Sequence, residues 1–221
     1  MTRFKGVLFD LDGTLVDNYT AIHMCVCAAF GRLGIPAPSY EKIVRTVGGS
    51  ILITMKKLLA GGEFENLYED AARIYLELYP EYVFYGLSEM PHARAVLEAL
   101  KGRGLRLGCF TNKQVEGAEE ILKKLDLAKY LDCVAATSLH SPRKPERAFT
   151  LAALEKLGLG AGETVGVGDS PFDYMAAEAA GMASALVATG GASKEELAAK
   201  CPRAIGVFEN LEALSKAVLG F

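Results

Sequence analysis

The sequence predicts an α/β fold in which a parallel sheet is interrupted by an inserted helical subdomain. Beyond residue 91, short apolar runs alternate with helical patterns, and this alternation is typical of βαβ units in a parallel sheet. Between residues 17 and 85 the pattern is helical and contains no convincing strand. A run of helices placed directly after a first strand indicates a subdomain separate from the sheet.

The first elements follow from a change of period near Asp17. The apolar run 7–9 predicts a buried strand, because it is short and ends at a turn signal. The next residues favour a helix that ends before Gly34, with Asp17 and Asn18 as candidates for its N-cap. Its apolar positions recur at helical spacing: Tyr19, Ile22, Cys25 or Val26, Ala29 and Leu33. Further helical patterns cover 41–47, 50–60 and 63–80.

The rest of the chain predicts alternating helices and strands. Pro91 suits the first position of a helix that ends at Gly104. Gly158 and Gly181 are placed to end two later helices. The expected strands are 105–110, 132–137, 164–167, 183–187 and 204–208. The expected helices between them are 114–125, 146–157 and 171–180.

Composition excludes several classes of protein. Of 221 residues, 51% are hydrophobic, so a substantial core is expected and disorder is not. The 24 basic and 27 acidic side chains leave a net charge of −3, which offers no electrostatic footprint for nucleic acid. No apolar run approaches the roughly 20 residues that span a bilayer. The N-terminal residues lead straight into the first strand and leave no room for a signal peptide, so we expect a cytoplasmic protein.

Two sets of side chains are interpreted as structural. An odd number of cysteines in apolar segments favours buried, reduced thiols: Cys25, Cys27, Cys109, Cys133 and Cys201. Four tyrosines at near-helical spacing are expected to pack at the end of the helical subdomain: Tyr75, Tyr79, Tyr82 and Tyr85.

The most informative stretch is 9–17, where two carboxylates follow the first strand. Asp10 and Asp12 are two residues apart, so their side chains share a face of an extended chain. They stand at the carboxyl end of a strand, where the active sites of parallel sheets gather. Two such carboxylates repel each other unless a cation or a shared proton relieves them. The alternative is a simple turn at Gly13 with solvated acids.

Three later landmarks share this architecture. Thr111 follows the second predicted strand. Asp169 follows the strand at 164–167, and Asp173 lies four residues later. Between Thr111 and Asp169, Lys144 opens a helical segment. An acid pair, a hydroxyl, a lysine and a second acid pair thus follow one another, and most of them stand at predicted strand ends.

Together these motifs resemble those of the haloacid dehalogenase-like hydrolase superfamily, in its phosphoglycolate-phosphatase-like branch. The resemblance extends from Lys5 to about Val187. It implies a Rossmann-like hydrolase core over residues 1–16 and 86–221, and a helical cap over residues 17–85. It also implies a Mg²⁺-dependent phosphatase that acts on a small phosphorylated metabolite, with phosphoglycolate as the first expectation.

Asp10 and Asp12 are expected to carry the chemistry. Phosphoryl transfer needs a well-placed nucleophile and strong charge neutralisation. Asp10 is expected to attack phosphorus and form an aspartyl-phosphate, which divides one difficult hydrolysis into two easier steps. Its alternative role is that of a metal ligand alone. Asp12 is expected to act as general acid and then general base. The resemblance supports this role, because the dehalogenase branch lacks an acid at this position.

A divalent cation is expected because a phosphate monoester and Asp10 are both anions. Asp10, Asp169 and the backbone carbonyl of Asp12 offer hard oxygen ligands, which suit Mg²⁺. By resemblance, Asp173 supports this metal site, either directly or through a water molecule. Its alternative role is that of a first-turn acid stabilised by the helix dipole.

The phosphate group is expected to meet several polar groups. Thr111 offers a hydroxyl and a backbone N–H, Asn112 follows it, and Gly13 allows a close approach of the backbone. Lys144 is expected to supply a positive charge and to orient the nucleophile, although a lysine before proline is also compatible with a solvated position. The family often has a proline where Arg147 stands, so the shape of this loop is open.

The cap is expected to supply specificity. The stretch from Arg45 to Gly49 resembles a cap loop that faces the active site in phosphoglycolate-phosphatase-like members. Arg45 could pair with a carboxylate or phosphate of the substrate. A solvated arginine on a helix face is equally compatible with the sequence.

Two departures favour a hydrolase over a β-phosphoglucomutase-like sugar phosphomutase. Alignment from Asp10 places the catalytic histidine of those mutases at Ile22, one residue from His23. The mutases also tend to have an acid where Gly168 stands. The remaining alternatives are a pyrophosphatase or nucleotidase, and an inactive protein that binds a phosphate ligand. Both a monomer and a homodimer are compatible with the sequence.

Overall fold

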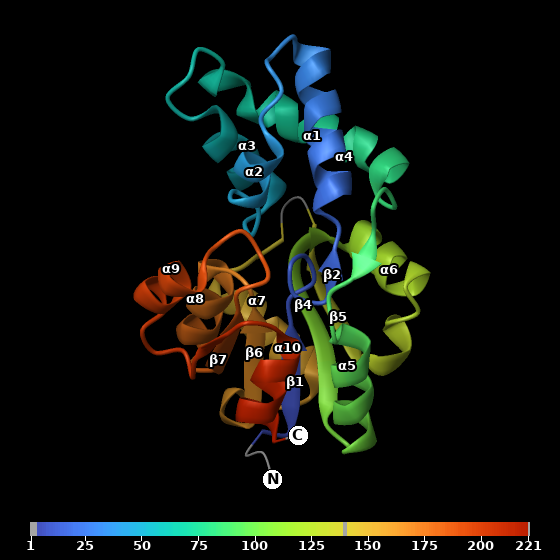
Figure 1. Ribbon diagram of the computed structural model, residues 1–221, viewed down its shortest axis with the longest axis vertical. Coiled ribbons are helices and arrows are strands. Elements are labelled where there is room, and N and C mark those ends of the chain that lie inside the picture. The colour runs from blue at the N-terminus through green and yellow to red at the C-terminus, as the bar shows by residue number, and fades with distance from the viewer. Residues whose placement is uncertain (1–3, 139–140, 221) are drawn as a thin grey trace.

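The computed structural model describes residues 4–138 and 141–220. Within those residues its centre is a six-stranded sheet in the order β5-β4-β1-β6-β7-β8, and every neighbouring pair runs parallel (Figure 1). The strands are β1 (Gly6–Phe9), β4 (Arg106–Gln114), β5 (Cys133–Thr137), β6 (Thr164–Gly168), β7 (Ala183–Val187) and β8 (Val207–Phe208). The first strand therefore lies inside the sheet, between β4 and β6, and the predicted Rossmann-like core is confirmed.

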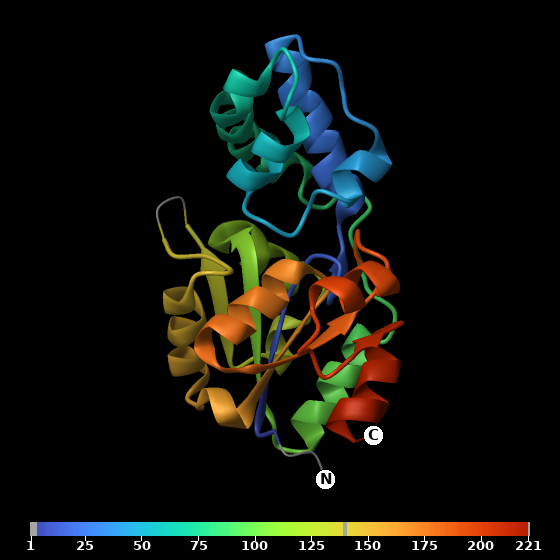
Figure 2. The same ribbon diagram turned by 90° about the vertical axis from the view of Figure 1, so that its left-hand side faces the viewer.

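Helices cover both faces of this sheet (Figure 2). Val7 and Phe9 share one apolar cluster with α5 (Ala93–Gly102), whereas Leu8 shares another with α7 (Arg147–Leu157) and α8 (Pro171–Ala180). Because successive side chains of a strand point to opposite faces, a strand covered on both sides has an uninterrupted apolar run. The remaining core elements are α6 (Val115–Lys124), η2 (Ala128–Tyr130), η3 (Ala161–Glu163), α9 (Lys194–Lys200), α10 (Leu211–Leu214) and η4 (Ser215–Leu219).

The inserted helices form a cap above the carboxyl edge of the sheet (Figure 1). Its elements are α1 (Tyr19–Leu33), α2 (Tyr40–Val44), α3 (Ile51–Leu59), η1 (Glu65–Leu67) and α4 (Tyr68–Tyr82). Helices α1 and α4 pack against each other, and the Cys25 thiol donates to the Tyr75 carbonyl at 3.4 Å. The predicted helical insertion is confirmed, while its division from the core at residues 17 and 85 stays a prediction.

The chain enters and leaves the cap through a two-stranded antiparallel ribbon. In it, β2 (Val16–Asp17) pairs with β3 (Ser88–Glu89). Strands of two residues are too short to show an alternating pattern, so the sequence did not indicate them. In this ribbon, the segment that leads into the cap and the segment that leaves it are hydrogen-bonded to each other.

Of two predicted helix starts, the one at Asn18 is confirmed in position and the one at Pro91 is wrong. Asn18 occupies the N-cap position of α1, but its side chain makes no capping bond and instead donates to the Tyr79 hydroxyl at 2.9 Å. Pro91 is not the first residue of its helix, because α5 begins at Ala93. His92 precedes it with φ of 68°, a left-handed turn that delays the helix.

Other boundaries also differ from the prediction. Strand β4 continues through Thr111 to Gln114, and the last strand is reduced to two residues. Helices α9 and α10 were not predicted. The glycines at 34, 158 and 181 end their helices in the left-handed conformation, as predicted.

The cysteines and tyrosines follow the prediction in part. All five cysteines are free thiols, although Cys27 and Cys133 are only half-buried. Tyr75 and Tyr79 stack with ring centroids 5.2 Å apart, whereas Tyr85 is exposed. None of the described helices combines the length and apolar character that crossing a bilayer demands.

The two apolar layers lead to a prediction about stability. Leu97 of α5 is fully buried, so Leu97→Ala is expected to lower the free energy of unfolding by about 2–5 kcal/mol. Leu151→Ala on α7 is the matched control, because Leu151 is 39% exposed and should change it by less than about 1 kcal/mol. Urea denaturation of both variants measures the difference, and equal losses would contradict this assignment of the core.

Candidate active site

The candidate site lies where three neighbouring strands end. Asp10 follows β1 and continues its ladder by donating a backbone hydrogen bond to Val167 at 2.8 Å. Asp169 directly follows β6, and Thr111 lies in the last part of β4. These strands are adjacent in the order β4-β1-β6, so their carboxyl ends bring the three side chains to one edge.

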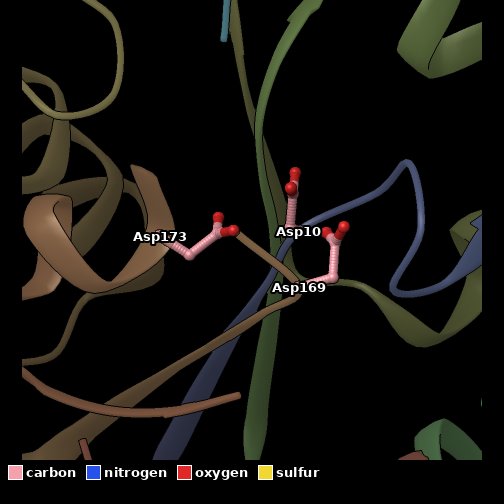
Figure 3. Close-up of side chains that lie close together, drawn as sticks. All are labelled: Asp10, Asp169 and Asp173. Carbon is pink, nitrogen blue, oxygen red and sulfur yellow. The ribbon is translucent and has the colours of Figure 1, made fainter. Parts of the chain in front are cut away.

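Three buried carboxylates converge at this edge. Asp10, Asp169 and Asp173 each offer an oxygen atom, and these atoms lie within 4.8 Å of one another. Figure 3 shows the carboxylates of Asp10 and Asp169 side by side, with Asp173 pointing towards them from α8. All three residues are nearly inaccessible to solvent. Such a cluster of like charges is relieved by a cation or by a proton on one of the carboxylates.

Lys144 supplies one positive charge to this cluster. Its side chain is fully buried, and Nζ lies 2.9 Å from Asp10 Oδ1 and 2.6 Å from Asp173 Oδ1. The ammonium also lies 5.1 Å from the centre of the Phe110 ring. The solvated alternative for Lys144 is therefore wrong, and the presence of Arg147 in its loop leaves this double ion pair intact.

Asn112 holds Lys144 in place through the backbone. The Lys144 N–H donates to Asn112 Oδ1 at 2.8 Å, and Asn112 Nδ2 donates to the Lys144 carbonyl at 3.2 Å. Asn112 Nδ2 also lies 3.3 Å from the Gly48 carbonyl of the cap. Its side chain thus positions Lys144 and contacts the cap at the cavity, while a contact of Asn112 with substrate stays a prediction.

Asp173 has two partners on opposite sides. Its Oδ2 accepts hydrogen bonds from the Ser170 backbone N–H at 3.0 Å and from the Ser170 hydroxyl at 2.6 Å, which caps α8. Its Oδ1 accepts from Lys144. Asp173 is therefore a first-turn acid that also belongs to the buried cluster, and its support of a metal ion stays a prediction.

Asp169 is closely surrounded by backbone. The Thr14 hydroxyl donates to Asp169 Oδ1 at 3.2 Å. A Cβ atom at Gly13, whose φ is +79°, would lie 2.6 Å from Asp169 Oδ2, and one at Gly190 would also collide with this carboxylate. Glycine is needed at Gly13 for both reasons. Gly190 was not predicted, although a glycine pair after the strand at 183–187 was a visible signal.

Burial controls the electrostatics of the cluster. It raises the pKa of Asp10 to about 7, and the charge of Asp173 adds to this rise while Lys144 opposes it. Burial and the charge of Asp10 raise the pKa of Asp169 well above its usual value. Burial acts to lower the pKa of Lys144, but Asp10 and Asp173 outweigh it and raise that pKa. The cluster is thus short of positive charge, and its buried oxygen donors fit a hard divalent cation.

Asp12 has a basic partner that the sequence interpretation missed. Lys113 Nζ lies 3.0 Å from Asp12 Oδ2 and 3.1 Å from Oδ1. Burial acts to lower the pKa of Lys113, but the charge of Asp12 outweighs it and raises that pKa. A signal was present, because Lys113 lies two residues after Thr111 and shares its face of the strand.

A cavity of about 70 Å³ opens above these groups, between core and cap. Its floor is polar, and the cap covers it mainly with apolar side chains. The lining residues are Asp10, Asp12, Ile22, Val47, Gly48, Gly49, Ile51, Thr54, Tyr75, Leu76, Tyr79, Thr111, Asn112, Lys113 and Gln114.

Arg45 is not among the residues that line this cavity. It follows α2, and its Nη2 donates to Glu196 Oε1 of α9 at 2.8 Å, with 64% of the side chain exposed. The end of α2 also lies tightly against the core, because a Cβ atom at Gly191 would collide with the Val44 carbonyl. In this arrangement Arg45 joins cap and core, and its contact with substrate stays a prediction.

Comparison with known proteins agrees with this geometry. The model of the haloacid dehalogenase-like hydrolase family matches residues 7–187. The chain belongs to this hydrolase family. The match covers every motif from Asp10 to Asp173, so the family predicted from the sequence is confirmed.

Similar proteins are phosphoglycolate phosphatases or haloacid dehalogenase-like hydrolases. This chain is 31% identical over 200 residues to a phosphoglycolate phosphatase of Shigella boydii, and the match covers 81% of this chain and 79% of the relative. It is 32% identical over 178 residues to a phosphoglycolate phosphatase of Nitrosococcus oceani, covering 79% of each. A haloacid dehalogenase-like hydrolase from Streptococcus pneumoniae has a similar structure, with a TM-score of 0.85, 25% identity and coverage of 98% and 99% of the two chains.

The repulsion within the acid cluster leads to a prediction for the metal-free hydrolase. Asp169→Asn removes one buried charge and keeps the shape, so it should raise Tm in EDTA at pH 8. Because folding raises the pKa of Asp10 and Asp169, the folded state binds more protons than the unfolded state above pH 4. Wild-type stability from these groups therefore falls as pH rises towards 7, and the advantage of Asp169→Asn should grow over that window.

Thermal denaturation between pH 5 and pH 8 measures this effect. Glu119→Gln on α6 is the matched control, because Glu119 is exposed and the change is again from acid to amide. An Asp169→Asn variant that is less stable than wild type at every pH would contradict the proposed repulsion.

Proposed function

We propose that this hydrolase is a Mg²⁺-dependent phosphatase that transfers the phosphoryl group of a small monoester first to Asp10 and then to water. The observation that carries the proposal is the buried Asp10 carboxylate, which stands at the tip of β1 between Lys144 and Asp169. The relatives named phosphoglycolate phosphatase support phosphoglycolate as the first substrate.

The contacts of Asp10 suggest which of its atoms attacks phosphorus. Lys144 Nζ and the Leu11 backbone N–H both approach Oδ1, at 2.9 Å and 2.7 Å. These bonds engage Oδ1 and leave Oδ2 available to the substrate. We therefore assign Oδ2 as the nucleophile that forms the aspartyl-phosphate.

Asp12 is placed to move the protons. It lines the cavity two residues after the nucleophile, on the side covered by the cap. In the first step Asp12 would donate a proton to the leaving alkoxide, and in the second it would take a proton from the attacking water. Acid–base catalysis of this kind contributes roughly 10²- to 10⁴-fold in rate.

The residues that would hold Mg²⁺ are Asp10, Asp169 and the backbone carbonyl of Asp12. Both oxygens of Asp173 already accept hydrogen bonds, from Lys144 and Ser170, which favours support of the metal through a water molecule. When bound, the ion would neutralise charge between the substrate phosphate and the nucleophile. Thr111 lies near the end of the neighbouring strand β4, where its hydroxyl would hold a phosphate oxygen.

The cavity favours a short substrate. Its volume of about 70 Å³ is small, and the apolar side chains of the cap offer few partners for the hydroxyl groups of a sugar. This supports a phosphatase for a short monoester over a sugar phosphomutase. A cytoplasmic location and a monomeric or homodimeric state stay predictions of the sequence.

Asp10→Asn tests the nucleophile. The amide cannot form an acyl phosphate, so kcat for phosphoglycolate should fall by about 10³-fold or more. The fold should persist, because the substitution removes a buried charge. Asp70→Asn in the cap, where the side chain is 52% exposed, should retain activity. Circular dichroism checks folding, and near-wild-type turnover by a folded Asp10→Asn variant would rule out the aspartyl-phosphate mechanism.

Removal of the metal tests the acid cluster. EDTA should abolish turnover, Mg²⁺ should restore it, and Ca²⁺ should inhibit because it accepts longer bonds and higher coordination numbers. Mg²⁺ should also raise Tm of the wild-type protein but not of Asp169→Asn. Full turnover in chelator-treated, metal-free protein would contradict the proposal, as would an equal rise of Tm in the two proteins.

A further inference from the structure

One basic side chain reaches the cavity from the core. Among the described residues that line the cavity, Lys113 alone carries a positive charge. Lys144 is fully buried, and Asp10 and Asp173 share its ammonium. Arg45 pairs with Glu196 of the core helix α9. A negative group on the leaving alcohol of a substrate would therefore meet Lys113 first.

Lys113 is held in a defined position. Its side chain is only 7% exposed, and Nζ lies 4.8 Å from the centre of the Tyr79 ring. The Tyr79 hydroxyl in turn accepts a hydrogen bond from Asn18. The Lys113 carbonyl accepts from the Thr137 hydroxyl at 3.1 Å. A cation fixed in this way loses little conformational entropy when it binds an anion.

The ammonium has capacity for another partner. It carries three N–H donors, of which Asp12 engages two, while the neutral Tyr79 hydroxyl competes for the third, so an incoming carboxylate would displace only that neutral partner. An anionic leaving group placed near Asp12 would be repelled by that carboxylate unless a cation lies between them. Lys113 already lies against both oxygens of Asp12, so it is positioned to neutralise such a group.

The rest of the cavity wall selects against other leaving groups. Ile22, Ile51 and Leu76 present apolar surface from three different cap helices. In the described lining, the hydroxyl groups that come from cap helices α1 to α4 are those of Thr54, Tyr75 and Tyr79. Hydroxyl groups that face this apolar part of the wall would have no protein partner, which is costly where they lose their water.

We propose that Lys113 is a specificity-determining residue that binds a carboxylate on the leaving group, so that the substrates are short phosphate monoesters of hydroxy acids. The proposal rests on the phosphatase function proposed above. It assigns to Lys113 the recognition that the sequence suggested for Arg45.

Two isosteric pairs of ligands test the proposal. Phosphoglycolate and ethyl phosphate differ by a carboxylate in place of a methyl group, and both are turned over only if the phosphatase function holds. 3-Phosphonopropionate and propylphosphonate differ in the same way and cannot be hydrolysed at phosphorus–carbon bonds by this route. The first pair is compared by kcat/KM, and the second by calorimetric Kd in the presence of Mg²⁺.

The expected result is a loss of preference in Lys113→Met. The preference for phosphoglycolate over ethyl phosphate should fall by about 10- to 100-fold, as should the preference for 3-phosphonopropionate over propylphosphonate. The loss of the ion pair with Asp12 affects kcat/KM or Kd equally for both ligands of a pair, so this effect cancels in the ratio. Lys123→Met on α6 is the matched control, because Lys123 is exposed on the surface of the core and should leave both ratios unchanged.

Three outcomes would overturn the proposal. One is an equal loss for both members of each pair in Lys113→Met, which would limit Lys113 to positioning Asp12. Another is a fall of the ratios in Arg45→Ala but not in Lys113→Met, which would return the carboxylate to Arg45. The third is equal affinity of the wild-type protein for the two phosphonates, a result that needs no folded variant. If the wild type hydrolyses neither phosphate ester, the phosphatase function fails, and the phosphonate ratios still decide the role of Lys113.

Discussion

The buried ammonium of Lys144 is the interaction on which the site depends. It lies between Asp10 and Asp173, at 2.9 Å and 2.6 Å, and none of its side chain reaches solvent. The carboxylates come from the end of β1 and from α8, so this one cation joins two elements that would otherwise repel each other. Asn112 of β4 fixes its backbone. Three carboxylates share this single ammonium, and the negative charge that it leaves unbalanced makes the site suitable for a metal ion.

The parallel sheet makes this arrangement possible. Placing β1 between β4 and β6 brings three strand ends to a single edge, where the chain turns away and side chains can converge. Close packing then requires small residues. Gly13 and Gly190 both lie against the Asp169 carboxylate, so the backbone itself encloses the oxygen atoms and keeps them from solvent. The burial that makes the acids costly to ionise is therefore produced by the fold and relieved by cations.

The cap is coupled to the chemistry through side chains that touch both units. Asn18, at the start of α1, donates to Tyr79 of α4, and the Tyr79 ring lies against Lys113, which pairs with Asp12. A second contact joins Asn112 to the Gly48 carbonyl. Asp12, the proposed acid–base residue, and Asn112, which binds the Lys144 backbone, are thus connected to the cap by these contacts.

The sequence by itself determined the elements whose signal is local. Apolar runs marked the strands, and the polar residues that end them, Asp10, Thr111 and Asp169, were correctly expected at one edge because parallel strands share a direction. The ribbon of β2 and β3 was missed, because two residues show no period. Only the tertiary structure decided the ion pairs. Lys113 meets Asp12 across 101 residues of chain, and Arg45 meets Glu196 across 151. Such distances depend on how the crossovers and the cap pack, and no local pattern of residues encodes them.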